Sequence, residues 1–179
     1  MQKNIVLAIT GSIAAYKACD IIQTFKYNNY NVRVLLSQAG AEFITPLTLR
    51  TLSSHPVITN TFSDNCSIEH VELAPWASAF VIAPATANII AKCAHGIADD
   101  IISTTYLCMQ DKPVFFAPAM NTRMWQHQQT IANINKLKKQ SHIIEPIKKQ
   151  LACGDMGIGA LANPKDIVQY ILKTLSTNE

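Results

Sequence analysis

Charge is scarce in this sequence: Asp, Glu, Lys and Arg make up 15% of its 179 residues, while hydrophobic residues make up 49%. A monomer of this size normally carries more charge on its surface, so the balance favours an oligomer. The net charge of +3 is too small to indicate a nucleic-acid partner, and the lysines between positions 136 and 149 are expected on a solvated helix face and loop. No apolar run reaches the roughly 20 residues that a membrane span requires, so no membrane partner is expected.

The cysteine patterns of metal sites and of secreted proteins are also missing. The five cysteines form no CxxC pair and no His-Cys ligand spacing, so no metal site is expected. Their odd number, and a start in which Met1 leads almost directly into an apolar segment without a signal peptide, predict a cytoplasmic protein. With no linker or internal repeat, residues 1–179 are expected to form a single domain.

Short apolar segments alternate with helical patterns along the chain. The predicted strands are residues 4–10, 31–36, 57–58, 79–83, 113–117 and 142–145, and the predicted helices are residues 13–26, 46–52, 89–95, 100–109, 122–139 and 164–175. Residues 148–163 are predicted as a glycine-rich loop. This alternation predicts an α/β fold with a doubly wound, Rossmann-like parallel sheet between two helical layers. Right-handed crossovers place the loops after the strands at one edge, where a composite site is expected.

The turn after the first predicted strand has only part of the glycine pattern of a dinucleotide site. Gly11 and Ser12 follow it and open a helix, where backbone amides favour an anion. Ile13 stands where the dinucleotide fingerprint needs glycine, and Ser37 stands where an acidic residue would hold a ribose. NAD is therefore disfavoured and FMN fits better, with the hydroxyls of Ser37 and Thr86 as further phosphate donors. The alternative is that Ser12 only caps its helix.

A second candidate site is the loop 118–125 (PAMNTRMW), which follows the strand at 113–117. Proline restricts the backbone, and a stiff loop suits holding the Asn121 amide in one place. The alternative is a rigid strand-to-helix turn with Met124 and Trp125 in the core.

One histidine and one cysteine stand out from their surroundings. His70 precedes Trp76 near a predicted strand-edge loop, where an imidazole can act as acid or base near neutral pH; the alternative is an ordinary surface or capping histidine. Cys153 lies in the glycine-rich segment 151–159, which predicts a flap that closes over a ligand and in which a thiol could deliver a proton. The alternative there is an incidental cysteine.

Five segments together suggest a family. They are Gly11–Lys17 (GSIAAYK), His70 with Trp76, Pro84–Asn88 (PATAN), Pro118–Trp125 (PAMNTRMW) and Ala152–Gly159 (ACGDMGIG). In this order, and spanning nearly the whole chain, they resemble the flavin-containing cysteine decarboxylases, in particular those acting on phosphopantothenoylcysteine. The resemblance implies a flavodoxin-like fold, trimers or dodecamers, and FMN bound at subunit contacts.

The implied reaction is decarboxylation of 4′-phosphopantothenoylcysteine to 4′-phosphopantetheine in coenzyme A biosynthesis. A carboxylate on a carbon beside an amide nitrogen has no electron sink, so the CH2–SH group is first oxidised to a thioaldehyde. Loss of CO2 then gives an enethiol, which is reduced with the electrons stored on the flavin. The ligase that makes the substrate is an expected partner, as a fused or a separate chain.

The resemblance also implies roles for individual residues. His70 would be the base, Asn121 would hold the substrate carboxylate and Cys153 would donate the final proton. The implied FMN-binding residues are Gly11, Ser12, Ile13, Ser37, Thr86, Ala87, Asn88 and Ala119. The implied substrate-binding residues are Met120, Asn121, Ala152, Gly154, Asp155 and Leu161. Ile89, Gln150 and Leu161 depart from the residues that the family often has, which weakens any statement about how the pantothenate arm is gripped.

Three other functions share part of this pattern. An oxidative decarboxylase of a peptide's C-terminal cysteine stops at the enethiol and does not need Cys153. A flavin prenyltransferase has a similar fold and FMN site but is not expected to have this set of motifs. A non-catalytic regulatory relative would be signalled by loss of His70 or Asn121, and both are present.

Overall fold

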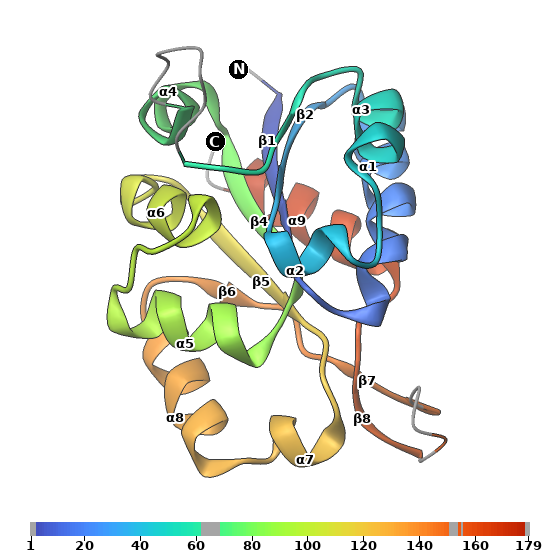
Figure 1. Cartoon of the computed structure of the whole chain (residues 1–179), viewed down its shortest axis with the longest axis vertical. Helices are drawn as coiled ribbons and strands as arrows, with labels where there is room; N and C mark the ends of the chain where they lie inside the picture. Colours follow the sequence, from blue (N-terminus) through green and yellow to red (C-terminus); the bar gives the residue numbers. More distant parts are fainter. Residues whose placement is uncertain (1–2, 62–68, 151–153, 155, 178–179) are drawn as a thin grey trace.

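The computed structural model describes residues 3–61, 69–150, 154 and 156–177. Its centre is a six-stranded sheet of order β3-β2-β1-β4-β5-β6, in which every neighbouring pair is parallel (Figure 1). The strands are β1 (Asn4–Ile9), β2 (Asn31–Leu36), β3 (Val57–Ile58), β4 (Ala79–Ala85), β5 (Val114–Pro118) and β6 (His142–Ile143). This is the order of a doubly wound Rossmann-type sheet, and without the two-residue edge strand β3 it is the 2-1-3-4-5 order of flavodoxin, so the predicted three-layer, flavodoxin-like fold is confirmed.

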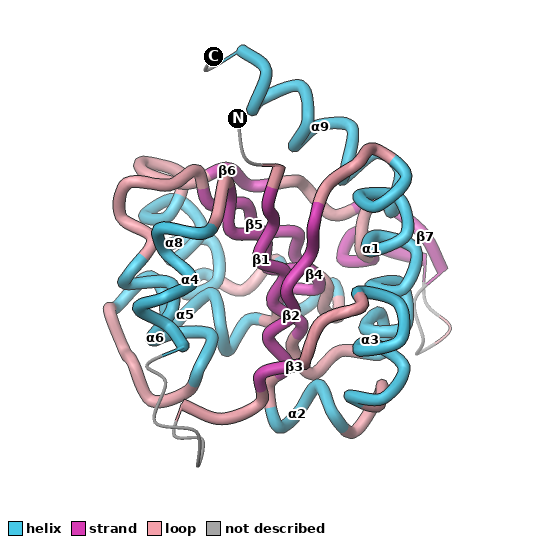
Figure 2. Tube along the Cα trace, turned by 90° about the horizontal axis from the view of Figure 1, so that it is seen from above, coloured by secondary structure: helices cyan, strands magenta, loops and turns pink. Residues whose placement is uncertain are grey.

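Helices cover both faces of the sheet, which explains why β4 is apolar along its whole length and β1 is apolar after Asn4 (Figure 2). On one face, side chains such as Leu7 pack with the helices α1 (Ala18–Tyr27), α3 (Pro46–Ser53) and α9 (Pro164–Thr177). On the other, side chains such as Val6 pack with α4 (Glu69–Trp76), α5 (Ala87–His95), α6 (Ile101–Cys108) and α8 (Gln128–Leu137). Gly96, with a left-handed φ of 69°, forms the C-cap of α5.

The strand order reverses between β1 and β4. The chain runs from β1 outward to β3 and then returns to the other side of β1 as β4, so the loops after β1 and β4 diverge and leave a crevice at the carboxyl edge. The buried Thr10 ties these loops together: its Oγ1 donates to the carbonyl of Pro84 (2.7 Å) and accepts from the amide of Thr86 (3.1 Å). The expected composite site therefore has a rigid floor.

Two of the predicted helices differ from the helices in the structure. The helix predicted at 13–26 begins as the 3-10 segment η1 (Ile13–Lys17) before α1. The prediction of a single helix over 122–139 is wrong, because the structure has two helices there, α7 (Thr122–Trp125) and α8. His127 causes the break: its backbone is extended, and its imidazole accepts from the amide of Gln129 (3.2 Å), which starts a new helix.

The prediction of a loop over 148–163 is also wrong. β7 (Ile147–Gln150) and β8 (Met156–Ala160) form an antiparallel two-stranded sheet that projects from the body of the molecule beside the carboxyl edge (Figure 1). Lys148, Lys149 and Gln150 are exposed, so the apolar alternation that usually signals a strand is missing.

In the part of the chain that is described, no helix combines the length and the apolarity needed to cross a bilayer.

Candidate functional site

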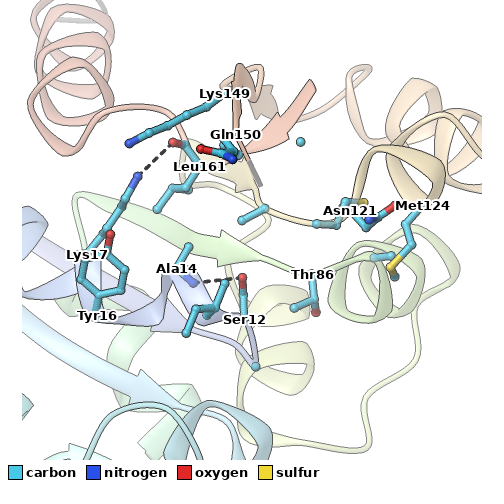
Figure 3. Close-up of a pocket in the computed structure, with 17 residues that line it drawn as sticks. Ser12, Ala14, Tyr16, Lys17, Thr86, Asn121, Met124, Lys149, Gln150 and Leu161 are labelled. Carbon is cyan, nitrogen blue, oxygen red and sulfur yellow. Dashed lines mark hydrogen bonds between the residues drawn. The ribbon is translucent and has the colours of Figure 1, made fainter. Parts of the chain in front are cut away.

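A cavity of 510 Å³ lies at the carboxyl edge of the sheet, between the loops after β1, β4 and β5 and the β7–β8 hairpin (Figure 3). Six of the predicted FMN-binding residues line it: Gly11, Ser12, Ile13, Thr86, Ala87 and Ala119. Three of the predicted substrate-binding residues line it as well: Met120, Asn121 and Leu161. Segments far apart in the sequence thus meet at one site.

The turn after β1 presents a hydroxyl to this cavity. Ser12 has an extended backbone and caps η1, with its Oγ accepting from the amide of Ala14 (3.2 Å). The cap expected from the sequence is therefore present, and it leaves the Oγ–H proton available for a ligand. Gly11 is required at the start of the turn, because a Cβ there would lie 2.6 Å from the Cβ of Ala39.

The loop after β4 adds a second hydroxyl in the same way. Thr86 caps α5, with its Oγ1 accepting from the amide of Ile89 (3.4 Å). Its own amide is already bonded to Thr10, so the O–H proton is the donor that Thr86 can offer to a ligand. Ile89, which departs from the expected family pattern, is buried in the core.

Asn121 is held by its own helix cap. It has φ −60° and ψ 147°, and its Oδ1 accepts from the amide of Arg123 (2.8 Å) to start α7. This bond fixes the orientation of the side chain, so that the amide nitrogen is the group that can donate to a carboxylate. Met124 is 48% exposed and lines the cavity, so the alternative that placed it in the core is wrong. Trp125 packs against the core while only partly buried.

Backbone hydrogen bonds hold the residues before Asn121 on both sides. The amide of Ala119 donates to the carbonyl of Ala85 on β4 (3.0 Å), and the amide of Met120 donates to the carbonyl of Gly159 on β8 (2.9 Å). The stiffness expected from proline thus comes largely from pairing with neighbouring strands.

Glycine allows β8 to approach this loop closely. A Cβ at Gly157 would collide with the hydroxyl oxygen of Thr122, and a Cβ at Gly159 would collide with the carbonyl oxygen of Met120. Gly159 also has a φ of 153°, which L side chains rarely adopt. The glycine spacing of this segment therefore serves close packing against the Asn121 loop.

Two lysines that were not predicted as site residues, Lys17 and Lys149, also line the cavity. Lys17 donates from Nζ to the carbonyl of Leu161 (3.5 Å), and Lys149 approaches from β7. Burial, and then the charge of Lys149, lower the pKa of Lys17, while Asp20 acts in the opposite direction. The sequence predicts Lys149 in a solvated loop. Its position beside the cavity follows from strand β7, which the sequence pattern does not predict.

Three predicted ligand-binding residues do not line this cavity. Ser37 caps the short helix α2 (Gln38–Ala41), with its Oγ accepting from the amide of Gly40 (3.0 Å). Asn88 is exposed on α5, and Gly154 is exposed in the hairpin with a φ of 90°. Their roles stay predictions, as do those of Ala152, Cys153 and Asp155, which lie outside the described residues.

His70 lies elsewhere than the sequence suggested. It belongs to the first turn of α4 rather than to a loop, and it does not line the cavity. In Figure 1, α4 and α7 lie at opposite ends of the view. The Nδ1 atom of His70 is buried, and it neither donates nor accepts a hydrogen bond within the described part of the chain.

Comparisons with known proteins show the family and the fold of this chain. The model of the family described as Flavoprotein matches residues 1–176. A probable phosphopantothenoylcysteine decarboxylase of Streptococcus mutans is 45% identical over 98% of this chain and 100% of the relative. The coenzyme A biosynthesis bifunctional protein CoaBC of Bacillus subtilis is 41% identical over 96% of this chain but only 43% of its own length.

Solved structures are similar over the whole fold. A PPC decarboxylase mutant in complex with pantothenoylaminoethenethiol superposes with a TM-score of 0.87 at 31% identity, covering 98% of this chain and 100% of the other. The FMN-binding protein AtHal3 gives a TM-score of 0.82 at 31% identity, covering 99% of this chain and 98% of the other. The chain belongs to the Flavoprotein family, among the relatives of phosphopantothenoylcysteine decarboxylase.

Proposed function

We propose that the protein is an FMN-dependent decarboxylase that converts 4′-phosphopantothenoylcysteine to 4′-phosphopantetheine in coenzyme A biosynthesis. The observation that supports this most strongly is the convergence of the Asn121 loop and the Ser12 and Thr86 hydroxyls on one cavity at the strand-order switch point. Open α/β sheets bind their ligands at this place.

The residues present suit FMN. Ser12 and Thr86 would donate to its phosphate, because each hydroxyl accepts from a helix amide and keeps its proton. The apolar side chains of Ile13 and Met124, 59% and 48% exposed, would lie against the flat ring system. When bound, FMN would accept two electrons from the substrate's CH2–SH group and later return them.

Asn121 would orient the substrate carboxylate through its amide nitrogen. A neutral amide positions the carboxylate without the strong stabilisation that a lysine or arginine would give to this negative charge. Loss of CO2 removes that charge, so tight ionic binding of the carboxylate would raise the barrier. A neutral donor therefore suits a decarboxylase.

His70 would complete the site from a second copy of the chain. This placement reconciles its expected role as base with its position on α4, away from the cavity of its own chain. The neighbouring Val71 is 52% exposed, and Tyr16 beside the cavity is 58% exposed, so both regions offer apolar surface for subunit contacts. A trimer, or four trimers, is the assembly that we propose, and a ligase as fused or separate chain is the proposed partner.

Two measurements test this function. Purified or reconstituted protein should show flavin absorbance and release CO2 from phosphopantothenoylcysteine. Thr86→Val should weaken FMN binding, whereas Thr86→Ser keeps both the hydroxyl and the helix cap and should bind FMN like the wild type. A protein that binds no flavin under any condition would overturn the proposal.

A further inference from the structure

Two ammonium groups gather at one side of the cavity. Lys17 is the last residue of η1, and Lys149 lies on β7 of the hairpin. Figure 3 shows the two side chains converging beside the carbonyl oxygen of Leu161, which accepts from Lys17 Nζ at 3.5 Å. Segments from the two ends of the chain thus bring like charges together.

No carboxylate of the described chain neutralises this pair directly. The ion pairs within the described ranges join Lys92 to Asp99 and Asp100, and Lys138 to Glu145. Burial and the charge of Lys149 both lower the pKa of Lys17, with Asp20 as the opposing influence. Lys17 is partly buried and Lys149 is exposed, and each ammonium group disfavours the charged form of the other, so an anion bound between them would offset this repulsion.

The position of the pair separates it from the other polar groups of the site. In Figure 3 the lysines lie at the opposite side of the cavity from Asn121 and Met124, and apart from Ser12 and Thr86. The cofactor and substrate of the proposed function bring three anionic groups: the FMN phosphate, the substrate carboxylate and the substrate phosphate. The hydroxyls and the Asn121 amide suit the first two, which leaves the substrate phosphate for the lysines.

We propose that Lys17 and Lys149 form a binding site for a phosphate monoester, namely the terminal phosphate of phosphopantothenoylcysteine, and so determine specificity. This inference rests on the proposed function. Lysine binds phosphate as a mobile point charge, which suits a group at the end of a flexible arm. A peptide ending in cysteine brings no such dianion and would leave the lysines unneutralised, so the pair selects against it.

The test compares matched lysine variants on two substrates. Lys17→Gln and Lys149→Gln remove one charge each, and Lys148→Gln is the control, because Lys148 is the exposed neighbour of Lys149 on β7 and does not line the cavity. KM is measured for phosphopantothenoylcysteine and for pantothenoylcysteine, which lacks the phosphate. Each cavity variant should raise KM for the phosphorylated substrate about tenfold and leave KM for the other unchanged. Lys148→Gln should change neither.

Affinities for FMN and for riboflavin, measured by flavin fluorescence on the same variants, separate the two sources of phosphate. Unchanged preference for FMN, together with the KM effect, supports the substrate site. Loss of the preference for FMN without loss of substrate discrimination would assign the lysines to the cofactor and overturn the proposal. Equal effects on both substrates, or none, would overturn it too. A wild-type protein that converts neither substrate refutes the proposed function itself, and this inference with it.

Discussion

The backbone amide of Met120 donates a 2.9 Å hydrogen bond to the carbonyl of Gly159. This bond joins the loop that carries Asn121 to strand β8, so the hairpin near the end of the chain helps to position the residue expected to hold the substrate carboxylate. Changes in the hairpin should therefore appear as changes in catalysis.

Gly159→Ala tests this link. The added Cβ would collide with the carbonyl oxygen of Met120, and the φ of 153° suits glycine, so β8 must move away from the loop. Because a small displacement of a positioning group costs about 100-fold in rate, kcat/KM should fall on that order. Gly96→Ala is the control: its φ of 69° is also unfavourable, but nothing lies within 4 Å of the added Cβ. It should cost about 1–2 kcal/mol of stability without changing kcat/KM.

Asn121→Asp separates the two roles of this side chain. Aspartate is as good an N-cap as asparagine, so the bond to the Arg123 amide and the start of α7 should be kept. The new charge would repel the substrate carboxylate, so decarboxylation should be lost while thermal stability and flavin content stay at wild-type values. Full activity in this variant would show that Asn121 does not hold the carboxylate.

Cys153→Ser distinguishes the two kinds of cysteine decarboxylase. If Cys153 donates the final proton, the variant should still release CO2 but accumulate the enethiol, detected by mass spectrometry. An oxidative decarboxylase would give the enethiol already in the wild type. Normal phosphopantetheine formation by the variant would refute the role of Cys153.

The ion pair at the start of α6 predicts a pH dependence of stability. Asp100 accepts from Lys92 Nζ (2.7 Å) and from the amides of Ile102 and Ser103 (2.9 Å each). Burial alone would raise the pKa of Asp100, but the bonds from Lys92 and Ser103 lower it. A lowered pKa in the folded state means that the stabilisation is present above about pH 3.9 and is lost as pH falls through the folded-state value.

Asp100→Asn keeps the helix cap and removes the ion pair. It should destabilise the protein by about 1 kcal/mol near neutral pH, with the difference disappearing in acid, as measured by urea unfolding at fixed protein concentration. Asp99→Asn is the control, since Asp99 also pairs with Lys92 but is 57% exposed and should contribute less. A difference that is independent of pH would contradict this account.

The strands of the central sheet could be predicted because their signal is local. β1 and β4 are buried on both faces, so apart from Asn4 their sequences are apolar, and the turns with Gly11, Ser12 and Thr86 follow directly. The meeting of these turns with Asn121 followed from the expected right-handed crossovers, which place the loops after parallel strands at one edge of the sheet.

Other features depend on contacts that the sequence does not reveal. The hairpin has an exposed, polar first strand, and Gly157 and Gly159 of its second strand are explained by packing against Thr122 and Met120. Because this strand was expected to be a loop, Lys149 could not be placed in the cavity. The position of His70 on α4 likewise depends on how the helices pack, and its short motif contains no information about that.

The most direct test of the proposed activity is the mass of the product formed from phosphopantothenoylcysteine by the flavin-loaded wild-type protein. We predict 4′-phosphopantetheine, lighter than the substrate by one CO2. A product that is lighter by CO2 and two further hydrogen atoms, or an unchanged substrate, would contradict the proposed function.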